Sequence, residues 1–296
     1  MLRKPTLFTL GNGTNVALSE GSGVGHCTGD VIWESAYVAA RFVEDAERLP
    51  RDVLLGEAAQ GAAAPAAAGG AKGAVRRPRI LDLSAGTGLV GISCACLGAH
   101  VVMSDYGAAG KLLLENNIAA NADAIAAAGG VCEAYDYAWG DGIDDGAGKS
   151  GSGAAAAAAA AAPPLLTRAP FDLVMCVDCV FIGVRDSIMH LLLRTLVALC
   201  PPPSGDGRDS LARRPQLVLA WKVRVEEKEA AFLAELAQHF ELEEVAREQL
   251  CYKDFDRRVC ADGAGSDSDA SSDGGMGSLF YHEDDDNVRV LLGRRK

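Results

Sequence analysis

The sequence predicts an α/β fold with a mainly parallel sheet, an antiparallel last strand and helices on both faces. Residues 79–105 have the pattern of strand, glycine turn, helix and strand ending in an acid, which is half of a nucleotide-binding unit. Five such alternations of strand and helix follow one another along the chain. The two strands predicted at 241–245 and 288–292 have no helix between them, which is typical of an antiparallel edge.

Four low-complexity stretches interrupt this pattern. They are rich in Ala, Gly, Pro, Ser or Asp and lie near 50–76, 142–169, 201–214 and 256–278. Such stretches bury little apolar surface, so they are interpreted as insertions. Without them roughly 200 residues remain, which is the size of one α/β domain. We therefore expect a single domain over residues 1–296.

The net charge of −12 and the absence of a Lys/Arg stripe argue against a nucleic-acid partner. The nine cysteines lie scattered in apolar runs, which predicts reduced thiols in a cytoplasmic or also nuclear protein. Cys176 and Cys179 lack a second pair for zinc, so no metal is expected. No apolar run approaches the ~20 residues that cross a bilayer. We expect a monomer without a membrane partner.

The N-terminal part predicts one or two short strands within residues 1–30 and then a helix from Val31 to about Arg48. Trp33 stands just before the start of this helix. An aromatic ring there can form the wall of a cofactor pocket or simply pack in the core.

The glycine turn admits two cofactors. Gly86, Gly88 and Gly91 satisfy the GxGxxG pattern of dinucleotide enzymes, and Asp105 stands at the distance expected for a ribose contact. With Asp82 inside the strand, the same stretch also satisfies the acid-x-Gly-x-Gly pattern of S-adenosylmethionine enzymes. That cofactor carries amino and sulfonium cations, which favour a carboxylate at Asp82, whereas a pyrophosphate would be repelled by it. We favour S-adenosylmethionine, with a dinucleotide as the alternative.

The segment 106–122 predicts a helix with Asn116 and Asn117 on its outer side. Its predicted inward residues are Leu112, Leu113, Leu114 and Ile118. Trp139 follows the next strand, at 131–135, where its ring can cover a flat adenine or pack in the core.

The strand at 171–177 ends in Asp178, at the edge where open α/β sheets bind ligands. A buried, unpaired carboxylate would cost several kcal/mol, so Asp178 requires a partner in the protein or in a substrate. A helix at 186–199, with an apolar face that begins at Ile188, a strand at 216–221 and a helix at 226–240 complete the predicted alternation.

Several segments match the motifs of one family. Asp82–Ile92 is similar to its cofactor loop, Glu/Asp-x-x-Ala-Gly-Thr-Gly-x-x-Gly, and Leu113–Ile118 to its Leu-Leu-x-x-Asn-Ile helix. Asp136–Gly140 resembles its Glu-Leu-x-Trp-Gly turn, and Ile32–Glu34 resembles its Val-Trp-Asp. The family is the family-16 group of seven-strand protein-lysine methyltransferases.

The resemblance implies a Rossmann-like seven-strand fold that binds S-adenosylmethionine, with Asp105 on the ribose and Trp139 against adenine. The implied cofactor-binding residues are Trp33, Asp82, Ser84, Gly86, Gly88, Asp105, Trp139 and Val177.

Two segments depart from the family pattern. Asp178–Phe181 resembles Asp-x-x-Tyr, and Trp221–Arg224 resembles Tyr-x-x-Arg, with a hydroxyl lost in each. The implied catalytic residues are Asp178, which would orient the acceptor amine, and Phe181. The first of these segments and the ending Asp286–Leu291 are most similar to the branch that methylates valosin-containing protein.

The function implied by the resemblance is methyl transfer to a lysine ε-amine of a protein substrate such as a chaperone, an AAA ATPase or a translation factor. Two alternatives remain open. The lost hydroxyls favour a binding module that keeps the fold and has weakened catalysis. Methyl transfer to a small-molecule amine is the other alternative.

Overall fold

The computed structural model describes residues 5–21, 28–45, 77–143, 165–180, 186–202, 216–252 and 287–296. The predicted insertions near 50–76 and 256–278 lie outside the described residues, as do most of those near 142–169 and 201–214. The single domain with four insertions therefore stays a prediction.

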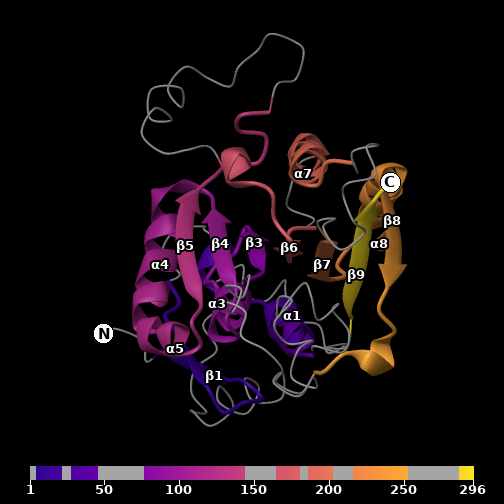
Figure 1. Cartoon of the computed structure of the whole chain (residues 1–296). Coiled ribbons are helices and arrows are strands. Elements are labelled where there is room, and N and C mark those ends of the chain that lie inside the picture. Colours follow the sequence, from indigo (N-terminus) through magenta and orange to yellow (C-terminus); the bar gives the residue numbers. More distant parts are fainter. Residues whose placement is uncertain are drawn as a thin grey trace, which may run out of the picture.

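The described strands form a seven-stranded sheet with the order β5-β4-β3-β6-β7-β9-β8 (Figure 1). Its strands are β3 (Arg79–Leu83), β4 (His100–Asp105), β5 (Val131–Asp136), β6 (Leu173–Val177), β7 (Gln216–Lys222), β8 (Phe240–Glu244) and β9 (Val288–Arg295). The strands β3 to β7 pair in parallel, while β9 runs antiparallel to both of its neighbours. The mainly parallel, Rossmann-like sheet with an antiparallel last strand is thereby confirmed.

The predicted antiparallel edge is the pair of β9 and β8, and β9 is the inner strand of that pair. In β9, Val290 and Leu291 are both buried and belong to the cores on opposite faces. A strand buried on both faces suits the interior of a sheet. The edge is formed instead by β8, whose sequence Phe-Glu-Leu-Glu-Glu is charged and mostly exposed, as is common for edge strands.

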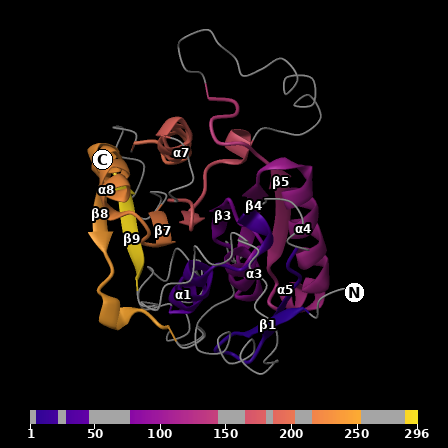
Figure 2. The same ribbon diagram turned by 180° about the vertical axis from the view of Figure 1, so that it is seen from behind.

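Helices cover both faces of the sheet (Figures 1 and 2). On one face lie α1 (Glu34–Glu44), α3 (Leu89–Cys96), α4 (Gly107–Ala120) and α5 (Ala122–Ala127), and on the other lie α7 (Asp186–Leu199) and α8 (Glu226–His239). Successive strand residues such as Ile80 and Leu81 point into the two separate cores. The strands are therefore apolar on both sides, which explains the continuous apolar runs in the sequence.

A separate hairpin of β1 (Thr6–Thr9) and β2 (Asn15–Leu18) packs beside α4. The side chain of Asn117 makes this connection: it accepts from the backbone N–H of Ser19 at 2.9 Å and donates to the carbonyls of Ser19 and Thr87. Asn117 is fully buried and Leu112 is 56% exposed, so the predicted inward face of this helix was wrong at both residues. The hydrogen bonds of Asn117 to the hairpin orient this helix, and the spacing of apolar residues gives no sign of them.

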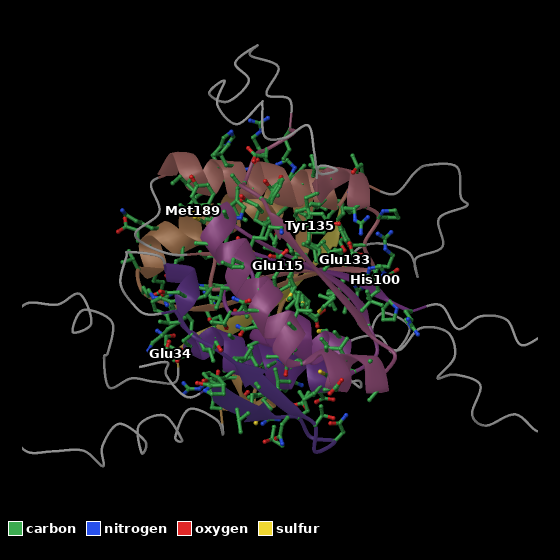
Figure 3. All side chains as sticks on the ribbon, turned by 90° about the vertical axis from the view of Figure 1, so that its left-hand side faces the viewer. Glu34, His100, Glu115, Glu133, Tyr135 and Met189 are labelled. Carbon is green, nitrogen blue, oxygen red and sulfur yellow. The ribbon has the colours of Figure 1, made fainter. Side chains whose placement is uncertain are left out.

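The outer edge strand β5 carries a polar cluster (Figure 3). Glu133 accepts from the Tyr135 hydroxyl at 2.8 Å, lies 2.9 Å from the His100 ring and pairs with Arg168. Charge on an edge strand opposes pairing with other chains.

Within the described residues, no helix is long and apolar enough to cross a membrane, and no group of three or more His, Cys, Asp or Glu side chains could hold a metal.

Candidate active site

A cavity of about 540 Å³ opens at the carboxyl ends of β3, β4, β5 and β6. The predicted site residues that line it are Trp33, Asp82, Ser84, Gly86, Asp105, Trp139, Val177 and Asp178. Gly88 does not line it, and Phe181 lies outside the described residues. Since neighbouring parallel strands end at the same edge of the sheet, the topology brings together residues that are up to 145 positions apart, such as Trp33 and Asp178.

Gly88 shapes the turn rather than the cavity wall. It has φ of +85° at the N-cap of α3, and a Cβ atom there would lie 3.0 Å from Leu114 and 3.3 Å from Met103. Positive φ and close packing both favour glycine at this position. Gly88 does not line the cavity, and its predicted contact with the cofactor stays a prediction.

Gly86 faces the cavity and is fixed by hydrogen bonding. Its φ is +56°, and its N–H donates to Asp105 Oδ2 at 2.7 Å. A Cβ atom on Gly86 would lie 3.2 Å from the carbonyl oxygen of Gly29. The turn that follows β3 is therefore tied to the end of β4, and it leaves backbone exposed to the cavity.

Asp82 is a buried carboxylate with one oxygen free. Its Oδ2 accepts from the N–H of Gly91 at 2.9 Å, while Oδ1 has no hydrogen-bond partner among the described residues. Burial raises the pKa of Asp82 to about 7, and the charge of Asp105 adds to the effect while the Gly91 hydrogen bond opposes it. An unpartnered oxygen at the wall of a cavity suits a cationic ligand. With a pKa near 7, Asp82 is partly protonated at neutral pH, so it repels a pyrophosphate less than the sequence analysis assumed.

Asp105 is held by two backbone donors and remains available to a ligand. Oδ2 accepts from Gly86, and Oδ1 accepts from the N–H of Tyr106 at 2.7 Å. Each oxygen keeps a second lone pair, which a hydroxyl group can use. Burial raises the pKa of Asp105, and the two hydrogen bonds lower it in part.

Aromatic rings line the same part of the cavity. The Trp139 ring lines the cavity and its Nε1–H donates to the Ser84 hydroxyl at 2.8 Å, which fixes the ring beside the glycine turn. Tyr106 also lines the cavity and is 75% exposed. Sequence reasoning missed Tyr106, although its position directly after Asp105 was a usable signal.

On the other side of β3, Asp178 has its partner within the protein. Arg224 donates to both carboxylate oxygens, at 2.8 Å to Oδ1 and 2.7 Å to Oδ2, and the backbone N–H of Lys222 donates to Oδ1 at 3.2 Å. The Asp178 and Arg224 side chains are only 6% and 10% exposed. Asp178 also has φ of +56°, which costs about 1–2 kcal/mol in a residue other than glycine. The sequence included Arg224 in a motif but did not assign it this contact.

Trp221 is not part of the cavity wall. It is fully buried in the core between the sheet and α8, and its Nε1–H donates to Glu229 at 3.0 Å. The family pattern has a tyrosine at this position, and here the indole N–H supplies a hydrogen-bond donor. Because Trp221 does not line the cavity, an effect of this departure on catalysis stays a prediction.

The family model described as lysine methyltransferase matches residues 13–150. Within that range the chain is similar to the family-16 methyltransferases. It is 29% identical over 170 residues to the protein N-lysine methyltransferase METTL21A of Danio rerio, a match that covers 56% of this chain and 59% of the relative. It also shares the fold of the Thermus thermophilus 16S rRNA N2 G1207 methyltransferase, with a TM-score of 0.52 at 14% identity, over 100% of this chain and 51% of that one.

S-adenosylmethionine is the cofactor that this similarity indicates, and the residues of the cavity fit it. Asp82 offers an unpartnered oxygen to a cation, and Asp105 offers lone pairs to hydroxyl groups. The rings of Trp139 and Tyr106 offer flat apolar surface for a purine.

Proposed function

We propose that this protein transfers a methyl group from S-adenosylmethionine to the ε-amine of a lysine in a protein substrate. The family model and the relative's name support this acceptor. The observation that carries the proposal is the cavity itself, because it joins two unlike ends. Asp82 and Asp105 lie on the β3 and β4 side, whereas Asp178 follows β6 and is linked to Trp33 through Arg224.

The chain's residues would divide the reaction as follows. The cofactor supplies an electrophilic methyl group on a sulfonium ion. A lysine amine has a pKa near 10.4 in water, and it must lose its proton before its lone pair can attack. The apolar side chains of Val177 and Ile188 at the cavity wall would desolvate the amine and so favour its uncharged form. Asp178 would accept an N–H of the amine and aim the lone pair, so that positioning supplies most of the rate.

The first test is calorimetric titration of the purified protein with S-adenosylmethionine and, separately, with NADH. We expect binding of the first ligand alone. Tritium-labelled S-adenosylmethionine is then incubated with protein and lysate, and the labelled band is digested to locate methyllysine. Binding of NADH alone, or labelling that appears only in the small-molecule fraction, would contradict the proposal.

The binding-module alternative predicts cofactor binding without labelling of any acceptor. Two departures from the family pattern favoured this alternative. Trp221 is buried away from the cavity and hydrogen-bonded to Glu229, and Phe181 lies outside the described residues. Several expectations stay predictions. They are a chaperone or AAA ATPase as the acceptor and membership of the branch that methylates valosin-containing protein. The others are a monomeric state, a cytoplasmic or nuclear location and the lack of a nucleic-acid partner.

A further inference from the structure

Arg224 connects two residues of the cavity wall that come from different elements. Its guanidinium donates to both oxygens of Asp178, at the end of β6, and lies over the Trp33 ring at 5.2 Å from the ring centroid, at the start of α1. Its own backbone N–H donates to Glu229 Oε1 at 2.8 Å. Because Arg224 is fixed by α8, it holds Asp178 and Trp33 in one arrangement.

In this region a carboxylate faces the cavity and the positive charge that pairs with it lies behind it. Asp178 lines the cavity, whereas Arg224 lies behind it and is not part of the wall. Lys222 Nζ lies 3.6 Å from Glu34, and Glu229 accepts backbone N–H groups and the Trp221 indole. Farther along the wall are Asp82 and Asp105. A ligand at the Asp178 end therefore meets a carboxylate whose charge is already balanced.

The pKa of Arg224 reflects this pairing. Burial by itself lowers the pKa of the guanidinium, but the hydrogen bonds and charge of Asp178, with the charges of Glu34 and Glu229, outweigh burial and raise the pKa. Two parallel N–H···O bonds also fix the plane of the carboxylate, which a single point charge would not do.

We propose that Arg224 is a positioning residue that neutralises Asp178, so that this end of the cavity accepts an uncharged amine in preference to an ammonium ion. The inference rests on the proposed function, since the uncharged amine is the form that attacks a methyl group. An unpaired carboxylate would stabilise the ammonium ion and so retain its proton. A paired carboxylate keeps a free lone pair on Oδ2, which can accept an N–H of the amine without holding a charge.

The test compares two ligands that differ in charge at the methyl position. S-adenosylhomocysteine has a neutral sulfur there, and sinefungin has a primary amine that is protonated at pH 7. Calorimetry gives the ratio of their dissociation constants for each protein. In Arg224→Met we expect sinefungin to gain about tenfold over S-adenosylhomocysteine, because Asp178 is then unbalanced. Arg224→Lys retains the positive charge, so its ratio should stay near that of the wild type.

Two further variants keep the inference testable if Arg224→Met does not fold. Asp178→Asn leaves the guanidinium unbalanced and should shift the ratio in the opposite direction, against sinefungin. The double variant Asp178→Asn with Arg224→Met buries no charge at this pair, and its ratio should return toward that of the wild type. A purely structural role for Arg224 would weaken both ligands equally and leave the ratio unchanged.

The outcomes separate this inference from the function on which it rests. An unchanged ratio in variants that still bind S-adenosylhomocysteine would overturn the role of Arg224 alone. A wild-type protein that binds neither ligand would overturn the proposed function, and this inference with it.

Discussion

The two ends of the cavity hold their carboxylates by different means. Asp82 and Asp105 accept hydrogen bonds from backbone N–H groups of the glycine turn and its neighbours. Asp178 is bound by the side chain of Arg224. Burial raises the pKa values of Asp82 and Asp105, and the hydrogen bonds from backbone N–H groups offset only part of this increase. The comparison shows that three acids at the ends of neighbouring strands can have different chemistry, because their partners differ.

The largest expected effect is at the cofactor end. Gly86→Arg places a long side chain in the cavity and a Cβ atom 3.2 Å from the carbonyl of Gly29. We expect S-adenosylmethionine affinity to fall at least ~100-fold, or by about 2.7 kcal/mol, as measured by calorimetry.

A matched control separates occupancy of the cavity from backbone strain. Gly13 also has positive φ, +87°, but nothing lies within 4 Å of a Cβ atom there. Gly13→Arg should lose a similar amount of stability and bind the cofactor normally. If both variants lose binding equally, the cavity is not the cofactor site.

The next largest effect is at the other end. Asp178→Ala leaves Arg224 without its carboxylate partner, and breaking a buried pair costs about 3–5 kcal/mol of folding stability. We expect methyl transfer to lysate proteins to be lost while affinity for S-adenosylhomocysteine, whose sulfur is uncharged, stays within about threefold. Asp172→Ala, which removes a buried acid at the opposite end of the same strand region, should lower stability without loss of transfer. Equal loss of binding and transfer in Asp178→Ala would make Asp178 a cofactor or structural residue.

The sequence predicted the strand–turn–helix order, the strand-end acids and both tryptophans of the cavity, because each depends on local pattern. It did not predict which partner each acid has. Arg224 follows Asp178 by 46 residues, and their contact depends on β6 and β7 being neighbours in the sheet. Asn117 was misplaced for the same reason, since its partners Ser19 and Thr87 are distant in sequence. Local periodicity records burial, whereas these side chains are oriented by hydrogen bonds between elements.

An effect on folding stability, which depends on pH, distinguishes the two ends further. The folded protein holds a proton on Asp82 up to about pH 7, whereas an unfolded chain releases it near pH 3.8. Stability is therefore lost as pH rises through this window, because the unfolded chain ionises freely while burial keeps the carboxyl group protonated in the folded protein. Asp82→Asn removes this titration and keeps an acceptor for Gly91. We expect the variant to gain on the order of 3 kcal/mol relative to the wild type between pH 4 and pH 8 in denaturant unfolding.

Cofactor binding should show the opposite dependence. A cationic ligand favours ionised Asp82, so wild-type affinity should rise with pH up to about 7, and binding near pH 6 should release a proton. Calorimetry in buffers of different ionisation enthalpy measures this release. Asp82→Asn should remove most of it. If the release persists, it comes from Asp105, whose pKa is also raised.

The smallest expected effect concerns how the Trp139 ring is held. Ser84→Ala removes the acceptor of its Nε1–H, and the net worth of such a bond, about 0.5–1.5 kcal/mol, predicts a two- to tenfold loss of cofactor affinity. Ser104→Ala is the matched control, because its hydroxyl is buried without a partner among the described residues. In a protein that already carries Trp139→Phe, adding Ser84→Ala should not lower the affinity further, because the indole N–H donor is already absent. If Ser84→Ala lowers affinity equally in both backgrounds, Ser84 contacts the cofactor itself, and the cofactor end has a third polar group beside its two acids.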